Sequence, residues 1–246
     1  MFDSKLKKFG KNVVLGFFTV IILLLTLLSL FTNAYLSWDE HTTIVADRPF
    51  WLLGWFIFIV IVLYFIRKKY KTQDTYYFNK IFLIVSLILL IVGIFMIFTI
   101  NFVPVADQQS ILEAASGLKN GNYSYFMPTG YVGKCSNQAG IVVILYYLSF
   151  LFGDNNYQAF QVLNIFGLLI SYYCLCQIST ISFRNEELKN WTLFLLVLFF
   201  PLTFYIAFVY GNIFGLAFSL LAILSGYEYF ESGKIRYILS SIISII

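Results

Sequence analysis

An acidic residue, Asp107, directly follows a long apolar run in the segment NFVPVADQQSILEAASGLKNGNYSYF, from Asn101 to Phe126. A carboxylate at the end of a membrane span can accept the proton of an attacking hydroxyl group, or help to hold a divalent cation. A structural role is equally open. Asp is a favoured helix N-cap residue, and Ser110-x-x-Glu113 matches the pattern of a capping box.

Polar and aromatic side chains follow Asp107. Lys134 precedes a short apolar run, and a lysine beside a helix N-terminus is typical of a phosphate site; a snorkelling interfacial lysine is the alternative. The aromatic rings could stack on sugar faces or line a prenyl chain, although aromatic belts are common at membrane interfaces. The candidate substrate-binding residues are therefore Lys134, Asn137, Gln138, Tyr123, Tyr125 and Tyr131.

A rival acidic pair, Asp39 and Glu40, lies in the polar segment SWDEHTTIVADRP. This segment has only about 13 residues, which leaves no room for a surface helix before the next apolar run. We therefore rank Asp107 above Asp39 and Glu40 as the candidate catalytic residue.

The composition places these residues in a membrane protein. Of the 246 residues, 60% are hydrophobic and 11% are charged, whereas soluble domains are about 45–50% apolar and about 25% charged. The net charge of +4 does not indicate nucleic-acid binding, because the basic residues lie beside apolar runs and are typical of topology anchors. His41 and the three cysteines, Cys135, Cys174 and Cys176, lack the spacing of a metal site.

The fold class predicted is an all-α bundle of about seven to eight transmembrane helices. The apolar runs lie at roughly residues 13–36, 50–66, 81–103, 140–152, 157–178, 191–209 and 213–227, and a last run reaches residue 246. Residues 1–80 are interpreted as two N-terminal spans with a basic cytoplasmic loop. Residues 81–246 are interpreted as the transmembrane core, with an outer loop at 104–139. Because the chain ends inside an apolar run, we expect the core to be truncated.

Basic residues predict the topology of the first half. The N-terminal MFDSKLKKFGK and the cluster around Arg67–Lys71 both predict a cytoplasmic side, which puts the N-terminus inside and Asp107 outside. In the second half, SFRNEELKN and SGKIR fall outside if every run crosses, against the positive-inside rule. A re-entrant or interfacial helix at 140–152, which is short for a span, would remove this conflict. The sequence leaves both topologies open.

The residues after Asp107 have the pattern of an amphipathic helix. Ile111, Leu112, Ala115 and Leu118 fall on one side, whereas Gln108, Gln109, Ser116 and Lys119 lie largely opposite. Asn120-Gly121-Asn122 then predicts a turn. We expect this helix to lie flat on the outer membrane face and to hold Asp107 near the lipid headgroups.

Taken together, these segments resemble the first outer loop and following helix of GT-C-fold membrane glycosyltransferases, the polyprenyl-phosphate-dependent mannosyltransferases and family 39 enzymes. The resemblance covers roughly residues 102–224. It is carried by VPVADQQSILEAASGLKNGNYSYF, by GKCSNQAGIVVILYYLSFLFG, by QVLNIFGLLISYY and by FVYGNIFGLAF. Two positions depart from the family pattern: Cys135-Ser136 replaces a usual proline before Asn137, and Asn212 stands where several relatives carry an acid.

The resemblance implies transfer of a sugar from a polyprenyl-phosphate carrier to a glycan, glycolipid or protein acceptor on the outer face of the cell membrane, in bacterial cell-envelope synthesis. Asp107 would act as the base, with inversion at the anomeric carbon. Lys134 would stabilise the phosphate leaving group, and a bound Mg²⁺ or Mn²⁺ is a further candidate.

Two other interpretations remain. A permease or lipid flippase subunit would carry ionisable residues inside its spans, and these spans contain almost none. An inactive fragment of a glycosyltransferase is the other alternative.

Overall fold

The computed structural model describes residues 2–36, 42–69, 75–154 and 156–245. The chain divides into two compact units, Met1–Lys71 and Thr72–Ile246.

The first unit is a pair of helices joined by a β-hairpin. α1 (Phe2–Phe31) leads into β1 (Thr32–Leu36), which pairs antiparallel with β2 (Thr42–Ala46) ahead of α2 (Pro49–Lys69). The expected extension of the first span to residue 36 is therefore wrong. Thr, Tyr, Val and Ile in the two strands favour extended backbone over a helix or an irregular loop. Asp39 and Glu40 lie outside the described residues.

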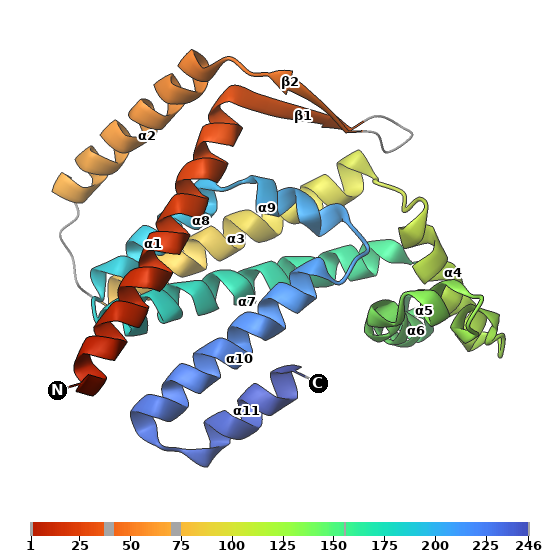
Figure 1. Cartoon of the computed structure of the whole chain (residues 1–246). Coiled ribbons are helices and arrows are strands. Elements are labelled where there is room, and N and C mark those ends of the chain that lie inside the picture. Colours follow the sequence, from red (N-terminus) through yellow and green to blue (C-terminus); the bar gives the residue numbers. More distant parts are fainter. Residues whose placement is uncertain (1, 37–41, 70–74, 155, 246) are drawn as a thin grey trace. The chain divides into compact units, whose positions relative to one another are not determined.

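The second unit begins with α3 (Thr75–Ile100) and continues to α7 (Tyr157–Phe183) through a group of short helices (Figure 1). These are α4 (Asp107–Lys119), η1 (Ser124–Phe126), α5 (Tyr131–Lys134), η2 (Ser136–Gln138) and α6 (Ala139–Phe152). At the start of α7, the Tyr157 hydroxyl and the Gln158 amide donate hydrogen bonds to Asn101 Oδ1, at 3.0 and 3.2 Å. Asn101 directly follows α3, so α7 starts at the end of the unit where α3 stops.

Because α3 ends and α7 begins at the same end of the unit, the path of α6 is restricted. The chain between Asn101 and Tyr157 leaves and re-enters the same end of the unit, so α6 does not run from one end to the other. The α5 and α6 segments are bent by 107° against each other, and Lys119 at the end of α4 forms a 2.6 Å ion pair with Asp154 just beyond α6. Of the two topologies that the sequence left open, the structure favours the re-entrant or interfacial one.

After α7 the chain returns through a broken helix. α8 (Glu187–Leu198) and the segment of α9 (Pro201–Phe204) and η3 (Tyr205–Ala207) are bent by 61° against each other. Pro201 contributes to this break, because proline has no N–H for a helical hydrogen bond. By η3 the chain is back at the Asp107 end, since Gln161 in the first half of α7 donates a hydrogen bond to Ala207 O at 2.6 Å.

α10 (Asn212–Ser232) then runs beside α7 in the same direction. A Cβ added at Gly167 of α7 would come within 2.8 Å of Ile213 Cγ2, so glycine permits the close approach. Further along, Cys174 packs with Leu220 and Leu224. α11 (Ile235–Ile245) folds back on α10, where the hydroxyl groups of Ser225 and Ser240 are 3.0 Å apart.

By length and composition, four helices in the described part of the chain are able to cross a membrane: Asn12–Phe31, Tyr77–Ile100, Tyr157–Phe183 and Asn212–Ser232. The number rises to six if each bent pair forms one span. The expected seven to eight spans are not confirmed. The apolar runs near residues 140–152 and after 234 form short helices, and the apolar part described for α2, Pro49–Val62, is short as well.

Candidate functional site

Asp107 is the first residue of α4, not its N-cap. The cap position is Ala106, which makes no side-chain hydrogen bond and has φ 51° and ψ −121°. Positive φ is uncommon outside glycine, and sparsely populated backbone of this kind concentrates at functional sites. The proposed capping box is also wrong. Ser110 N bonds to Ala106 O within the helix, and Glu113 accepts a hydrogen bond from Gln109.

The Asp107 carboxylate is bound by a tyrosine about one hundred residues further along the chain. Tyr210 donates its hydroxyl proton to Asp107 Oδ2 at 2.8 Å. The Tyr131 hydroxyl lies 3.3 Å from the Tyr210 hydroxyl. Because Tyr210 gives its single proton to Asp107, Tyr131 is the donor in this second bond. Asp107 is exposed, whereas both tyrosines are half-buried. The three side chains form a short relay that ends on a carboxylate open to solvent.

Burial raises the pKa of the Tyr210 hydroxyl well above its ordinary value, and the hydrogen bond to the Asp107 carboxylate raises this pKa further. Tyr210 therefore stays protonated at neutral pH and keeps donating to Asp107 Oδ2. The Tyr131 hydroxyl also interacts with this carboxylate. Because Asp107 is exposed, the carboxylate can still accept a proton from outside the protein.

Tyr210 is positioned by three buried amide side chains, which we call the amide clamp: Gln108, Gln161 and Asn164. Gln108 Oε1 accepts from Val209 N at 2.8 Å, and Gln161 Nε2 donates to Ala207 O. Asn164 Nδ2 donates to two further carbonyl groups, those of Ile206 at 3.1 Å and Phe208 at 2.8 Å.

The amide clamp supplies hydrogen-bond partners to the backbone between η3 and α10, which has none from a helix or a sheet. Residues 208–211 are in neither helix nor strand, and a buried carbonyl or N–H without a partner costs free energy. Gln161 and Asn164 are fully buried one helical turn apart on α7. Gln161 also donates to Phe102 O at 3.3 Å, so one amide contacts the backbone on both sides of the site.

The apolar face of α4 is covered by protein and does not lie free on a membrane. Ile111, Leu112 and Ala115 are buried in one cluster with Val142 and Leu145 of α6. Gln108, expected on the polar face, is buried because it belongs to the amide clamp. The amphipathic helix is confirmed, and its predicted flat contact with lipid is replaced by packing against α6.

The structure separates the predicted substrate-binding residues. Tyr131 joins Asp107, whereas the Tyr125 hydroxyl donates to Glu113 Oε2 at 2.9 Å. Tyr123 is 56% exposed. Exposed Lys134 has no ion pair or hydrogen bond from its ammonium group within the described part of the chain.

Asn137 and Gln138 precede α6 in η2 and differ in burial. Asn137 is exposed, whereas Gln138 is buried and its Oε1 has no hydrogen-bond partner among the described residues. Asn137 therefore faces solvent, and Gln138 retains an unused acceptor inside the protein.

The described residues contain no cluster of candidate metal ligands. No three side chains among the described His, Cys, Asp and Glu residues come close enough together to hold a metal ion. Asp107 is joined by two tyrosines, whereas Mg²⁺ and Ca²⁺ prefer carboxylate, carbonyl and water oxygens. A single exposed carboxylate can accept a proton, and Mg²⁺ can also bind through one carboxylate together with waters and substrate phosphates.

Sequence reasoning missed Tyr210 and the buried members of the amide clamp. The FVYGNIFGLAF segment contains Tyr210, but its comparison with the family pattern singles out Asn212, which is exposed at the start of α10. A signal was present, since Gln161 and Asn164 are polar residues inside an apolar run. Polar side chains in a span are costly to bury and often mark functional sites.

Comparison with known proteins gives no relative: no family model matches the chain, and neither a curated protein nor a solved structure is significantly similar to it.

Proposed function

We propose that this protein is a membrane glycosyltransferase, which moves a sugar from a polyprenyl-phosphate carrier to an acceptor on the outer face of a membrane. The observation that carries the proposal is the Asp107 carboxylate. It lies just beyond the end of α3, it is held through Oδ2 by Tyr210 at 2.8 Å, and it is exposed to solvent. The sequence resemblance supplies the reaction class.

In the proposed reaction, Asp107 Oδ1 accepts the proton of an acceptor hydroxyl group. The acceptor oxygen attacks the anomeric carbon of the donor sugar and forms the new glycosidic bond. The bond between the anomeric carbon and the phosphate oxygen breaks, and polyprenyl phosphate leaves with the electron pair. A single displacement of this kind inverts the anomeric configuration.

Tyr210 has a positioning role in this proposal. Its bond to Oδ2 fixes the orientation of the carboxylate, and a fixed base close to the reacting atoms avoids reorganisation during the reaction. Tyr131 fixes Tyr210 in turn. The relay contains one carboxylate, so general-base catalysis by Asp107 is the chemistry that it supports best.

Stabilisation of the leaving phosphate is assigned to Lys134. Negative charge develops on the departing phosphate oxygen, and a cation placed nearby lowers the barrier. The Lys134 ammonium group is exposed and has no partner in the described residues, so it is available to a ligand. Exposed Tyr123 and Asn137 are the remaining candidates for contacts with sugar hydroxyls and ring faces.

The test is sugar transfer in membranes that contain the protein with Asp107→Asn. The probes are radiolabelled polyprenyl-phosphate hexoses, and incorporation into lipid, glycan and protein fractions is measured. Loss of a general base lowers rates by roughly 10²–10⁴-fold, and we expect a decrease of that order. Asp154→Asn, which alters another exposed acid at the same end, is the matched control and should keep most of the transfer. Undiminished transfer by Asp107→Asn would exclude the assignment of the base.

A further inference from the structure

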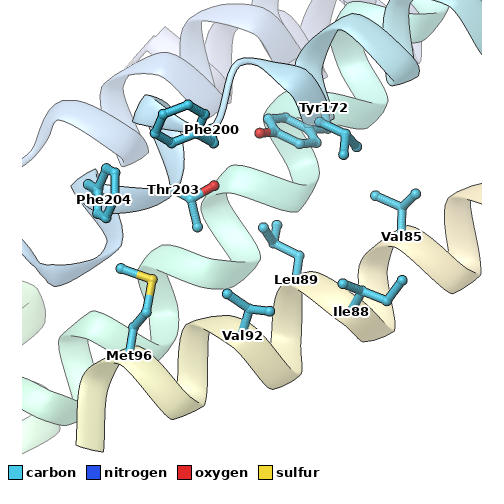
Figure 2. Close-up of a pocket in the computed structure, with 10 residues that line it drawn as sticks. Val85, Ile88, Leu89, Val92, Met96, Tyr172, Phe200, Thr203 and Phe204 are labelled. Carbon is cyan, nitrogen blue, oxygen red and sulfur yellow. The ribbon is translucent and has the colours of Figure 1, made fainter. Parts of the chain in front are cut away.

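An apolar cavity of about 280 Å³ lies between α3, α7, α8 and α9 (Figure 2). One wall is a stripe on α3, formed by Val85, Ile88, Leu89, Val92 and Met96. These residues are three or four positions apart, so they share one face of the helix. The cavity belongs entirely to the second unit and does not include Asp107 or Tyr210.

The break between α8 and α9 forms the opposite wall. Phe200, Thr203 and Phe204 lie at this break, and Figure 2 shows them across the cavity from α3. The bend of 61° turns α9 away from the direction of α8, and a straight helix would not leave the same concave wall. The break that returns the chain to Tyr210 therefore also shapes the cavity.

The inner wall of the cavity is formed by buried, well-packed residues, and it offers few polar groups to a ligand. Tyr172 is 1% exposed, and its hydroxyl donates to Leu196 O at 3.0 Å. Leu89 is buried in the same core cluster as Tyr172. With the Tyr172 hydroxyl already bonded, Thr203 brings the only other polar side chain among the described lining residues.

The cavity is long and follows the helix axis. From Val85 to Met96 the stripe on α3 extends over about 16 Å, at 1.5 Å of rise per residue. This stripe lies within Tyr77–Ile100, one of the helices able to cross a membrane. The shape fits a linear ligand that is parallel to the span at the depth of the hydrocarbon layer.

The side of the cavity is open at the surface of the second unit. Ile88 and Phe200 on its rim are 56% and 61% exposed. An apolar space of this size does not hold water stably, because water requires polar partners. If the cavity is empty, the residues that line it lose dispersion contacts. A hydrocarbon chain needs no polar partners, and it makes dispersion contacts with the lining residues.

We propose that this cavity binds one acyl chain of a bilayer phospholipid, which enters sideways between α3 and the α8–α9 break. Phospholipid is the ligand that surrounds a membrane span in excess, and its unbranched chain matches the narrow stripe on α3. The binding site is separate from Asp107 and does not depend on the reaction proposed above.

The experiment uses the full chain in phosphatidylcholine vesicles with a trace of phosphatidylcholine that carries a diazirine in the middle of one acyl chain. After irradiation, labelled peptides are identified by mass spectrometry. We expect labels to concentrate in residues 85–96 and 197–204 relative to the exposed apolar stretch 12–31. Equal labelling of all exposed apolar stretches would show only surrounding lipid and would overturn the proposal.

Two variants on the same helix sharpen this test. Ile88→Trp narrows the cavity, whereas Ile91→Trp places the same side chain at a 66% exposed position that does not line it. Filling the space should reduce labelling of residues 197–204 by about five-fold in Ile88→Trp, with little change in Ile91→Trp. Equal labelling of both variants would contradict the proposal, and the map of the unaltered protein stands even if a variant does not fold.

Two other occupants give different outcomes. Unlabelled polyprenyl phosphate that abolishes labelling at equimolar amounts would identify a prenyl chain in place of an acyl chain. A photoreactive amino acid at Val92 that cross-links to residues 12–31 or 49–62 would identify the first unit as the occupant. Either result would overturn the phospholipid proposal, whereas lipid adducts at Val92 would support it.

Discussion

At the scale of single residues, the candidate site depends on the carboxylate of Asp107. Tyr210 binds Asp107 Oδ2, and the carboxylate stays exposed to solvent. Ala106 contributes through its backbone, since its positive φ starts α4 directly at Asp107. A structural N-cap would direct the carboxylate towards its own helix. Here the carboxylate is instead bonded to a segment about one hundred residues further along the chain.

The raised pKa of Tyr210 predicts a loss of stability at alkaline pH. Because the folded protein holds this proton more tightly than the unfolded chain, the stabilisation is complete below the ordinary tyrosine pKa of about 10. It is lost as the pH rises above that value towards the folded pKa. Phenylalanine cannot ionise. We therefore expect the unaltered protein to lose more thermal stability than Tyr210→Phe between pH 8 and pH 11, measured by thermal unfolding in mild detergent.

Tyr123→Phe is the control for this titration, because the Tyr123 ring is exposed and its hydroxyl has no partner among the described residues. Its melting temperature should follow that of the unaltered protein at both pH values. If Tyr210→Phe and Tyr123→Phe respond identically to pH, Tyr210 does not carry the stabilising proton.

At the scale of elements, sequence patterns predicted the helices better than the contacts that place them. Apolar runs predicted α3, α7 and α10, since length and hydrophobicity are local properties. The amphipathic pattern of α4 was read correctly as a helix, but what covers its apolar face depends on α6, which the pattern does not contain. Asp107 was predicted as a candidate from its position. Tyr210 was not, because a contact between distant residues leaves no local periodicity.

The amide clamp is the element-scale feature that joins α7 to the segment before α10. Replacing Gln161 with Leu removes the donor to Ala207 O and to Phe102 O. A buried acceptor left without a partner costs about 1–3 kcal/mol, and we expect a decrease in unfolding free energy of about this size. Chemical denaturation in mild detergent measures it. Because the same segment holds Tyr210, sugar transfer should fall as well.

Gln177→Leu is the matched control for the clamp. Gln177 is also on α7 and partly buried, and its side chain makes no hydrogen bond within the described residues. Substitutions away from such contacts usually change stability by less than about 0.5 kcal/mol. Equal stability of the Gln161→Leu and Gln177→Leu variants would mean that the clamp does not hold this segment.

At the scale of the whole molecule, the path of the chain through the second unit places most of its basic residues at one end. Asn101 joins the end of α3 to the start of α7, and the amide clamp joins η3 to the first half of α7. α7 therefore runs away from the Asp107 end, the α8–α9 segment returns to that end, and α10 runs away from it again. Five basic residues lie at the end away from Asp107: Lys80, Arg184, Lys189, Lys234 and Arg236. Lys119 and Lys134 lie at the Asp107 end.

This distribution removes the conflict that arises when every apolar run is treated as a span. If α6 is not a membrane span, SFRNEELKN and SGKIR both lie on the side of the membrane opposite Asp107. The positive-inside rule then predicts that this side is cytoplasmic. Sequence alone could not decide, because residues 140–152 are apolar whether they cross or fold back. The bonds of Asn101 to the start of α7 supply the missing constraint.

Cysteine labelling in intact cells tests this topology. In a background with Cys135, Cys174 and Cys176 replaced, single cysteines at Asn122, Asp154 and Asn185 are treated with a membrane-impermeant maleimide. Asn122→Cys precedes α6 and Asp154→Cys follows it, so both should be labelled from outside if α6 does not cross. Asn185→Cys, beyond α7, should be labelled only after permeabilisation. If Asn122→Cys and Asp154→Cys were labelled from opposite sides, α6 would be a span, and the return of the chain to Asn101 would require a different path.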